Sequence, residues 1–184
     1  NVQFYDGITS TDIQETLIKS AADLISEETP NYQTVAGRLI VYHINKMVYG
    51  GATPWHIYKL VKHNVEKGFY DTELLSEYTE EEWNTINSWV KHERDEQLTY
   101  AAMEQFRGKY LVQNRVTKTL YETPQMAYML IAATLFQDYD RKTRLRYVKD
   151  YYDAISTHQI SLPTPVMAGV RTPQRQFSSC VLIE

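Results

Sequence analysis

The sequence contains a single cysteine, Cys180, so it cannot form a disulfide within the chain. Such scarcity is typical of proteins from a reducing compartment. No stretch approaches the roughly 18 consecutive apolar residues that a membrane-spanning helix needs. Residues 1–7 have neither a basic lead nor a long apolar run, which argues against a secretory signal peptide. These absences predict a cytoplasmic protein without a membrane partner.

An excess of charge of one sign is also absent. The chain of 184 residues has 19 Lys and Arg against 23 Asp and Glu, a formal net charge of −4. This balance gives no electrostatic argument for a nucleic-acid partner. The hydrophobic content of 43% is sufficient for a packed core. No metal site is predicted, because the histidines show no metal-ligand spacing: they are His43, His56, His63, His92 and His158.

Helical periodicity runs through most of the chain, which predicts a mainly α protein. Helix starts are predicted by capping boxes or threonine–proline pairs at Thr11 with Gln14, Thr53-Pro54, Thr79 with Glu82, and Thr123-Pro124. The expected helices run from residue 11 to before 30, over about 33–48, over 53–68, from 79, from 123, and over about 142–157. The side chains expected to face inward are Ile13, Leu17, Leu24 and Ile25; Val35, Leu39, Tyr42 and Met47; Trp83, Ile86 and Val90; Met126, Met129, Leu130, Ala133 and Phe136; and Leu145, Val148, Tyr152 and Ile155. The helix from 123 is apolar on several sides and should be central.

Three segments depart from the helical pattern. Residues 109–121 predict a short strand and turn. Residues 160–165 contain two prolines, each of which disfavours helical geometry at the residue before it, so no helix is expected there. The run Val181-Leu182-Ile183 is typical of a buried strand in a parallel sheet. The chain is therefore expected to lead from a helical region into the first strands of an interrupted α/β domain.

The last third of the sequence resembles a known family. ISLPTP at 160–165, GVRTP at 169–173 and RQFSSCVLIE at 175–184 are similar to the start of the catalytic barrel in the large subunit of class I ribonucleotide reductases. The spacing is unbroken from Ser161 to Cys180. Upstream segments that resemble the same subunit are YTEEE at 78–82, GKYLVQNR at 108–115, FYDGI at 4–8 and AADLI at 21–25. The resemblance covers essentially the whole chain and is nearest to bacterial and large-phage class Ia sequences.

The resemblance implies a division of the chain into three parts. Residues 1–50 would be the C-terminal part of an ATP-cone-like region, and residues 51–158 a helical N-terminal domain. Residues 159–184 would begin a ten-stranded catalytic α/β barrel that is truncated here. We therefore expect a piece of the large subunit that is inactive alone.

The same resemblance implies a chemistry, the radical-based reduction of ribonucleoside diphosphates to deoxyribonucleotides. In the family a separate small subunit with a di-metal centre supplies the radical, and a cysteine pair supplies the reducing equivalents. Cys180 stands at the position of the first cysteine of that pair, which thioredoxin or glutaredoxin re-reduces. Thr164 and Ser179 match positions that contact the substrate. The other catalytic cysteines are absent, because Cys180 is the only one in the chain.

The cone-like region carries weaker matches to an ATP or deoxynucleotide effector site. Lys46 matches a lysine of the family, Ser10 stands where a threonine is common, and Gln14 stands where a histidine is common. No cofactor is expected to bind this chain permanently.

An alternative function is a non-catalytic helical interaction module derived from a reductase. Without the resemblance, Cys180 is read as a small buried hydrophobic residue, and Thr164 and Ser179 as ordinary loop and strand residues. Arg141, Arg144 and Arg146 are expected to face solvent near a helix start.

Overall fold

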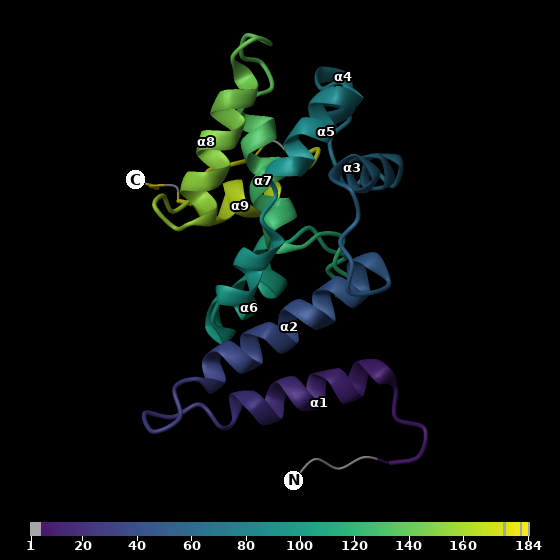
Figure 1. Ribbon diagram of the computed structural model, residues 1–184, viewed down its shortest axis with the longest axis vertical. Helices are drawn as coiled ribbons and strands as arrows, with labels where there is room; N and C mark the ends of the chain where they lie inside the picture. Colours follow the sequence, from purple (N-terminus) through teal and green to yellow (C-terminus); the bar gives the residue numbers. More distant parts are fainter. Residues whose placement is uncertain (1–4, 175, 181, 184) are drawn as a thin grey trace.

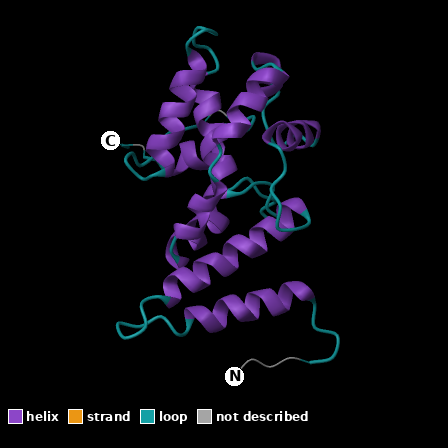
Figure 2. Ribbon diagram, in the orientation of Figure 1, coloured by secondary structure: helices purple, strands orange, loops and turns teal. Residues whose placement is uncertain are grey.

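A computed structural model describes residues 5–174, 176–180 and 182–183. These residues form helices and loops, with no β-strand among them (Figure 2). The prediction of a mainly α chain is confirmed. The elements are α1 (Ser10–Ala22), α2 (Tyr32–Tyr49), α3 (Ile57–Glu66), α4 (Glu73–Glu77), α5 (Glu80–Trp89), the 3₁₀ helix η1 (His92–Gln97), α6 (Tyr100–Gln105), the π-helix η2 (Phe106–Tyr110), α7 (Pro124–Phe136), α8 (Arg144–Ser156) and α9 (Thr164–Gly169), labelled in part in Figure 1.

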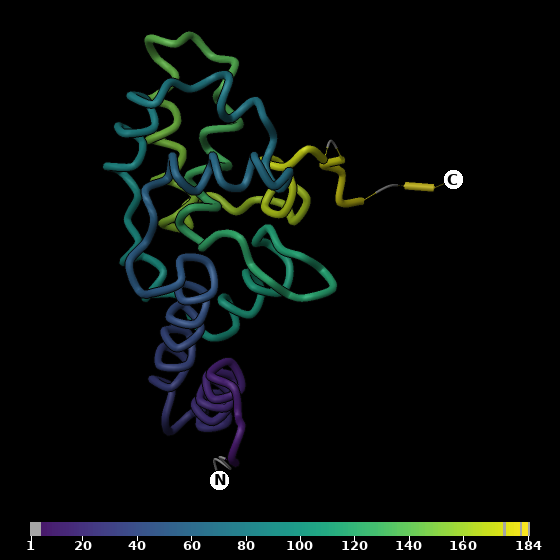
Figure 3. Tube along the Cα trace, turned by 90° about the vertical axis from the view of Figure 1, so that its right-hand side faces the viewer, coloured from purple at the N-terminus to yellow at the C-terminus, as the bar shows by residue number. Residues whose placement is uncertain are grey.

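The helices gather around α7, with the α1–α2 pair at one end of the molecule (Figure 1). Helix α1 packs against α2, and α2 packs in turn against α6 and η1. Helices α8 and α9 lie against α7, while α5 joins α3 to α8. Figure 3 shows the α1–α2 pair projecting from the rest of the bundle, and the residues after α9 leading away from it on another side.

Helix α7 forms the centre of the core, as predicted. Thr123 is its N-cap and Pro124 lies in its first turn, where a missing N–H costs no helical hydrogen bond. Met126, Met129 and Leu130 are completely buried. Because its apolar residues lie on all sides, α7 is covered by several helices at once.

Helix α5 begins with the predicted capping box. The Thr79 hydroxyl accepts a hydrogen bond from the Glu82 N–H at 3.2 Å, and the Glu82 carboxylate accepts one from the Thr79 N–H at 2.9 Å. Trp83 and Ile86 are buried against the core, and so is Val90 just past the helix end. The local signal therefore predicted this element correctly.

Helix α1 differs from the prediction in both its cap and its face. The N-cap is Thr9, which accepts a hydrogen bond from the Asp12 N–H, so the helix starts earlier than Thr11 indicated. Ile18 is buried, whereas the predicted inward residues Leu17 and Leu24 are exposed. Helix α1 packs mainly against α2, so only a narrow stripe of its surface is covered.

Helix α2 also turns a different face inward from the one predicted. Val35, Tyr42 and Met47 are exposed, and a neighbouring stripe that includes Ile40 is buried. Gly37 explains why this stripe faces the core, because a Cβ atom at this position would lie 2.3 Å from the Leu98 carbonyl oxygen. The helix is apolar on more than one side, and the side with the smallest residues admits the closest backbone approach.

Two other predictions about local structure were wrong. Helix α3 begins at Ile57, with the His56 Nδ1 accepting a hydrogen bond from the Tyr58 N–H, so Thr53-Pro54 precede the helix instead of opening it. Thr164 belongs to the first turn of α9. A proline in the first turn loses no helical hydrogen bond, so the prolines of residues 160–165 mark a helix start and not a wholly extended segment.

The predicted strand and turn at 109–121 is a short hairpin-like loop. Its pairing is an isolated antiparallel bridge between Gln113 and Leu120, with the Tyr121 N–H donating to the Val112 carbonyl. The predicted strand at 181–183 falls partly on Val181, which lies outside the described residues. Leu182 and Ile183 are exposed and have no regular secondary structure.

Candidate functional site

Cys180 lies in an exposed segment after α9 and is a free thiol. The Ser179 hydroxyl is 3.7 Å from its sulfur, and the Ser178 hydroxyl donates to the Cys180 carbonyl oxygen at 2.9 Å. Thr164 is exposed at the start of α9. Ser179 and Cys180 are neighbours in the sequence, and no hydrogen bond among the described residues links Thr164 to them.

Arg171 ties this C-terminal segment to the helical bundle through an ion pair with Glu122. Both side chains are completely buried. The Arg171 Nε donates to Glu122 Oε2 at 2.8 Å, and its Nη2 donates to the other carboxylate oxygen. Nη1 also donates to the Met167 carbonyl at 2.7 Å, and Nη2 to the Tyr110 carbonyl at 3.0 Å. Arg171 thus connects α9, η2 and the loop before α7. We call this pair the Glu122–Arg171 clamp.

The remaining acceptor capacity of Glu122 is used inside the same cluster. The Tyr70 hydroxyl donates to Oε2 at 2.7 Å, and the Val112 N–H donates to Oε1 at 2.7 Å. Burial and the neighbouring Glu122 carboxylate raise the pKa of Tyr70 well above 10, so its hydroxyl stays a donor. Burial works to lower the pKa of Arg171, but the neighbouring Glu122 carboxylate outweighs this effect and raises it above its ordinary value, so the guanidinium stays charged.

A contact at the end of α9 links the neighbourhood of the clamp to the segment that carries the cysteine. Gly169 is buried, and a Cβ atom there would lie 3.7 Å from the Phe177 ring and 3.7 Å from the Gln174 side-chain oxygen. Phe177 is half-buried and packs against the hydrophobic core. The cysteine follows it by three residues in the sequence.

The predicted effector residues lie near the interface of α1 and α2. Ser10 and Lys46 line a cavity of about 180 Å³ together with Thr11, His43 and Met47. Gln14 is buried and does not line this cavity. The structure therefore brings two of the three predicted effector residues together.

An adjoining cavity of about 420 Å³ separates α1 and α2 from η2 and the hairpin-like loop. Across it, Arg107 forms ion pairs with Glu15 at 2.8 Å and Glu104 at 2.7 Å, and the His43 Nε2 is 3.5 Å from Glu15. Burial lowers the pKa of His43, although the Glu15 carboxylate opposes this shift. These residues were not predicted. His43 is three residues before Lys46, a helical spacing that places both on one face.

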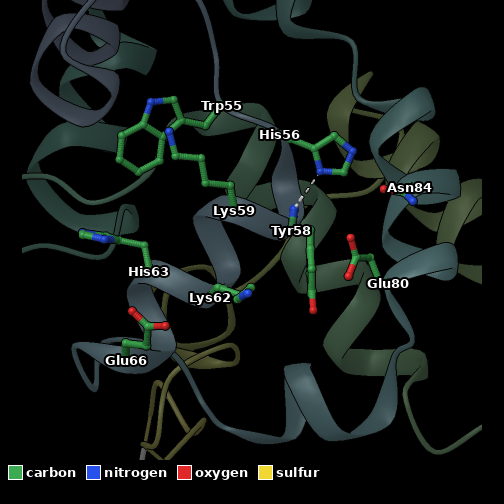
Figure 4. A pocket seen from close by; sticks show the side chains of 9 residues that line it. All are labelled: Trp55, His56, Tyr58, Lys59, Lys62, His63, Glu66, Glu80 and Asn84. Atoms are coloured by element: carbon green, nitrogen blue, oxygen red, sulfur yellow. Dashed lines mark hydrogen bonds between the residues drawn. The ribbon is translucent and has the colours of Figure 1, made fainter.

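Another cavity, of about 550 Å³, lies elsewhere, between α3 and α5 (Figure 4). Figure 4 shows Lys59 extending toward Trp55, with its Nζ 4.0 Å from the ring centroid. The Trp55 ring also meets His63 edge-on at 5.6 Å. None of the predicted site residues lines this cavity. The residues that line the cavity are Trp55, His56, Tyr58, Lys59, Lys62, His63, Glu66, Glu80 and Asn84. Because the charges of its two lysines are balanced by those of its two glutamates, the cavity has no net attraction for an anion.

A second buried arginine corrects the prediction for the start of α8. Arg144 is only 1% exposed, and its guanidinium donates to both Glu82 carboxylate oxygens and to the Gln137 carbonyl. It does not face solvent, because the Glu82 carboxylate of the capping box and a helix-end carbonyl together satisfy its charge. Burial acts to raise the pKa of Glu82, but hydrogen bonds from Thr79 and Arg144 lower it below its ordinary value.

Asp95 is a buried acid that the sequence did not single out. It accepts a hydrogen bond from the Gln125 side chain at 2.9 Å, and Gln125 accepts one from Tyr152 at 2.7 Å. Burial raises the pKa of Asp95 to about 7, against the opposing effect of Gln125. This network lies between η1, α7 and α8 and is remote in the sequence from the predicted site.

The described residues contain neither a candidate metal site nor a helix that could span a membrane. No group of three or more His, Cys, Asp or Glu is arranged to hold a metal ion. None of the described helices combines the length and the apolar character that crossing a membrane requires.

Comparison with known proteins gives consistent results. Residues 96–175 match the family described as "Ribonucleotide reductase, all-alpha domain". The whole chain is 56% identical to ribonucleoside-diphosphate reductase 1 subunit alpha of Escherichia coli K12 and 55% identical to the alpha subunit of Haemophilus influenzae, covering 24% of each. It is 49% identical to the alpha subunit of Enterobacteria phage T4, again covering 24% of that protein. The chain spans about a quarter of the length of these relatives.

The matched domain covers the described elements from η1 to α9 and includes the Glu122–Arg171 clamp. All-alpha architecture agrees with the absence of strands among the described residues. The chain is therefore homologous, over its full length, to the N-terminal region of class I ribonucleotide reductase alpha subunits.

Proposed function

We propose that this chain serves as the N-terminal helical region of a ribonucleoside-diphosphate reductase alpha subunit, with Cys180 as one of its redox-active cysteine pair. The observation that carries the proposal is identity of 49–56% along the whole chain to proteins of that name. The exposed, unpaired state of the Cys180 thiol supports the assignment, because a redox cysteine must reach both a substrate and a partner thiol.

The proposed chemistry is a two-electron reduction. A thiol is mostly protonated at neutral pH and can give its proton to the 2′ hydroxyl, which leaves as water. Two thiols then form one disulfide and supply two electrons and two protons in total. The second thiol and the radical-bearing cysteine would come from the rest of the alpha subunit, and the radical from a small subunit. A thioredoxin-like dithiol would reduce the disulfide again, which places the reaction in a reducing cytoplasm.

Thr164 and Ser179 are proposed substrate contacts. Ser179 lies beside the Cys180 sulfur, which supports its role. Thr164 lies at the start of α9, and its role rests on the resemblance alone. We also propose the division into residues 1–50, 51–158 and 159–184; the end of α2 at Tyr49 and of α8 at Ser156 lie close to these boundaries.

The test is a chimera in which this chain replaces the matching quarter of the Escherichia coli alpha subunit. With the small subunit, thioredoxin and a ribonucleoside diphosphate, the chimera should form deoxyribonucleotide over many turnovers. Cys180→Ser should reduce this activity by about 100-fold or more, because no disulfide can then form. Gln176→Ala is the matched control, since it changes an exposed neighbour and keeps the thiol. A folded chimera without activity would favour the non-catalytic interaction module.

Effector binding is proposed for the cavity that Ser10 and Lys46 line. Titration calorimetry of the chain with ATP and dATP measures it directly. Lys46→Ala should weaken any binding about 10-fold, by removing a charge that pairs with phosphate. Binding that Lys46→Ala leaves unchanged would locate the nucleotide elsewhere.

A further inference from the structure

The segment that carries Cys180 leaves the helical bundle after α9 (Figure 3). The buried Glu122–Arg171 clamp joins the start of this segment to the bundle. We propose that the clamp is a positioning device: it holds the end of α9 in one place and thereby sets the location of Cys180. The catalytic role of the cysteine rests on the proposed function, but its position can be measured independently of any reaction.

The shape of the guanidinium is what makes the clamp directional. Three Arg171 nitrogens donate four hydrogen bonds, two to Glu122 and one each to the Met167 and Tyr110 carbonyls. Met167 belongs to α9, and Tyr110 ends η2. A lysine keeps the charge but offers a single point donor, so it cannot hold these groups in one plane. The clamp therefore fixes both the distance and the orientation of α9.

The acid is held as firmly as the arginine. Glu122 accepts from Tyr70 and from the Val112 N–H in addition to Arg171. The backbone N–H of Asp71 also donates to the Arg171 carbonyl at 3.0 Å. Burying an ion pair adds little stability over apolar packing, whereas a fully hydrogen-bonded network excludes other arrangements. The clamp is therefore better suited to fixing the position of α9 than to adding stability alone.

The path from the clamp to the cysteine is short. Arg171 follows Gly169 by two residues, and the open face of Gly169 receives the Phe177 ring. Phe177 is packed against the core, and the Ser178 hydroxyl then bonds to the Cys180 carbonyl. Movement of α9 would remove the surface on which Phe177 rests, and the cysteine would lose its fixed place.

The experiment uses Cys180 itself as the probe, because it is the only cysteine of the chain and is exposed. A nitroxide label is attached to its sulfur in the 184-residue chain. The electron paramagnetic resonance spectrum of the label then reports its local motion. The unchanged sequence should give a spectrum with a restricted component. Arg171→Lys and Glu122→Gln should each increase the mobile fraction about twofold or more, since the loss of ordered contacts widens nanosecond motion.

The matched control is Arg144→Lys. Arg144 is the other fully buried arginine among the described residues, and its hydrogen-bond partners are Glu77, Glu82 and Gln137, which lie outside α9 and the segment that carries Cys180. This variant should lower Tm without changing the label spectrum. Circular dichroism confirms that every variant is folded at the temperature of the spectra. An Arg171→Lys spectrum identical to that of the unchanged chain, or a label that is already fully mobile there, would overturn the proposal.

Phe177→Ala keeps the test decisive if the clamp variants fail to fold. It removes a half-buried ring outside the clamp, so the chain should stay folded, with a modestly lower Tm, while the label becomes more mobile. A label spectrum that Phe177→Ala leaves unchanged would show that Phe177 does not hold Cys180 in place, and would contradict the proposal. An inactive chimera with a clamp-dependent label would refute the proposed function and leave the positioning intact.

Discussion

Buried ionisable side chains shape this helical bundle, and Arg171, Arg144 and Asp95 are satisfied by different kinds of partner. Arg171 is neutralised by Glu122, and Arg144 by Glu82 together with backbone carbonyls. Asp95 has a neutral partner, the Gln125 side chain. An isolated buried charge is costly, so an acid with a neutral partner takes up a proton more readily instead.

Asp95 predicts a specific pH dependence of stability. Its folded pKa of about 7 lies above the unfolded value of 3.8, so the folded state binds a proton more tightly. The resulting stabilisation is present at acid pH and is lost as pH rises through 7. Between pH 5 and 8 the free energy of unfolding should fall by about 2–3 kcal/mol through this group alone.

Asp95→Asn isolates the contribution, because asparagine stays neutral and keeps an acceptor for Gln125. Urea unfolding at pH 5 and pH 8 should show the variant gaining stability relative to the unchanged chain as pH rises. Asp153→Asn serves as the comparison: burial works to raise the pKa of Asp153, but Lys149 and Arg94 lower it. An equal difference between the Asp95 variant and the unchanged chain at both pH values would contradict the prediction.

At the scale of elements, close backbone approach decides how α2 packs. Gly37 lies in the middle of the helix, where glycine is normally unfavourable by about 1 kcal/mol relative to alanine. Its position is explained by the chain that crosses it, residues 98–100, whose nearest atom is the Leu98 carbonyl oxygen. Close packing against the connection between η1 and α6 thus outweighs the helix propensity of a single residue.

Gly37→Ala should destabilise the protein by about 1–3 kcal/mol, because backbone atoms must move to admit the methyl group. Gly108→Ala is the matched control within η2: a Cβ atom there meets nothing within 4 Å. Its greater helix propensity should leave stability unchanged or raise it by up to about 1 kcal/mol. Thermal unfolding of the two variants measures both effects. Equal changes in Tm would show that the approach to Leu98 is not limiting.

At the scale of the whole molecule, burial is distributed unevenly. Helix α7 is surrounded, and every residue from Pro124 to Ala133 is buried. Helix α1 has three buried residues and lies at the edge of the molecule, where Arg107 adds an ion pair to Glu15. Local opening should therefore be easier at α1 than at the centre.

Hydrogen exchange measures this gradient. Amides of α1 should exchange at least about 10-fold faster than those of α7, since few buried contacts oppose their opening. Arg107→Ala should accelerate exchange in α1 and leave α7 unaffected. Arg146→Ala, which alters an exposed ion pair on α8, should change neither helix. Equal protection in α1 and α7 would indicate that the chain opens as a single cooperative unit.

Much of the secondary structure was determined by the sequence itself. The capping box at Thr79 and the proline at 124 mark helix starts through short-range hydrogen bonding and backbone geometry, and the apolar run after Pro124 predicts the central helix. The chemistry proposed for Cys180 rests on the resemblance of the residues on both sides of it to a known family, and it stays a prediction. These signals are local, so no distant contact was needed to interpret them.

The tertiary structure decided which helix faces are buried and which charges are paired. Val35 and Ile40 are equally apolar, and only the partner surface determines that Ile40 is inside. Arg171 and Glu122 are 49 residues apart in sequence, so no periodicity could reveal their contact. Long-range packing chooses among alternatives that local propensity leaves nearly equal in energy. That choice joins the helical bundle to the segment carrying Cys180.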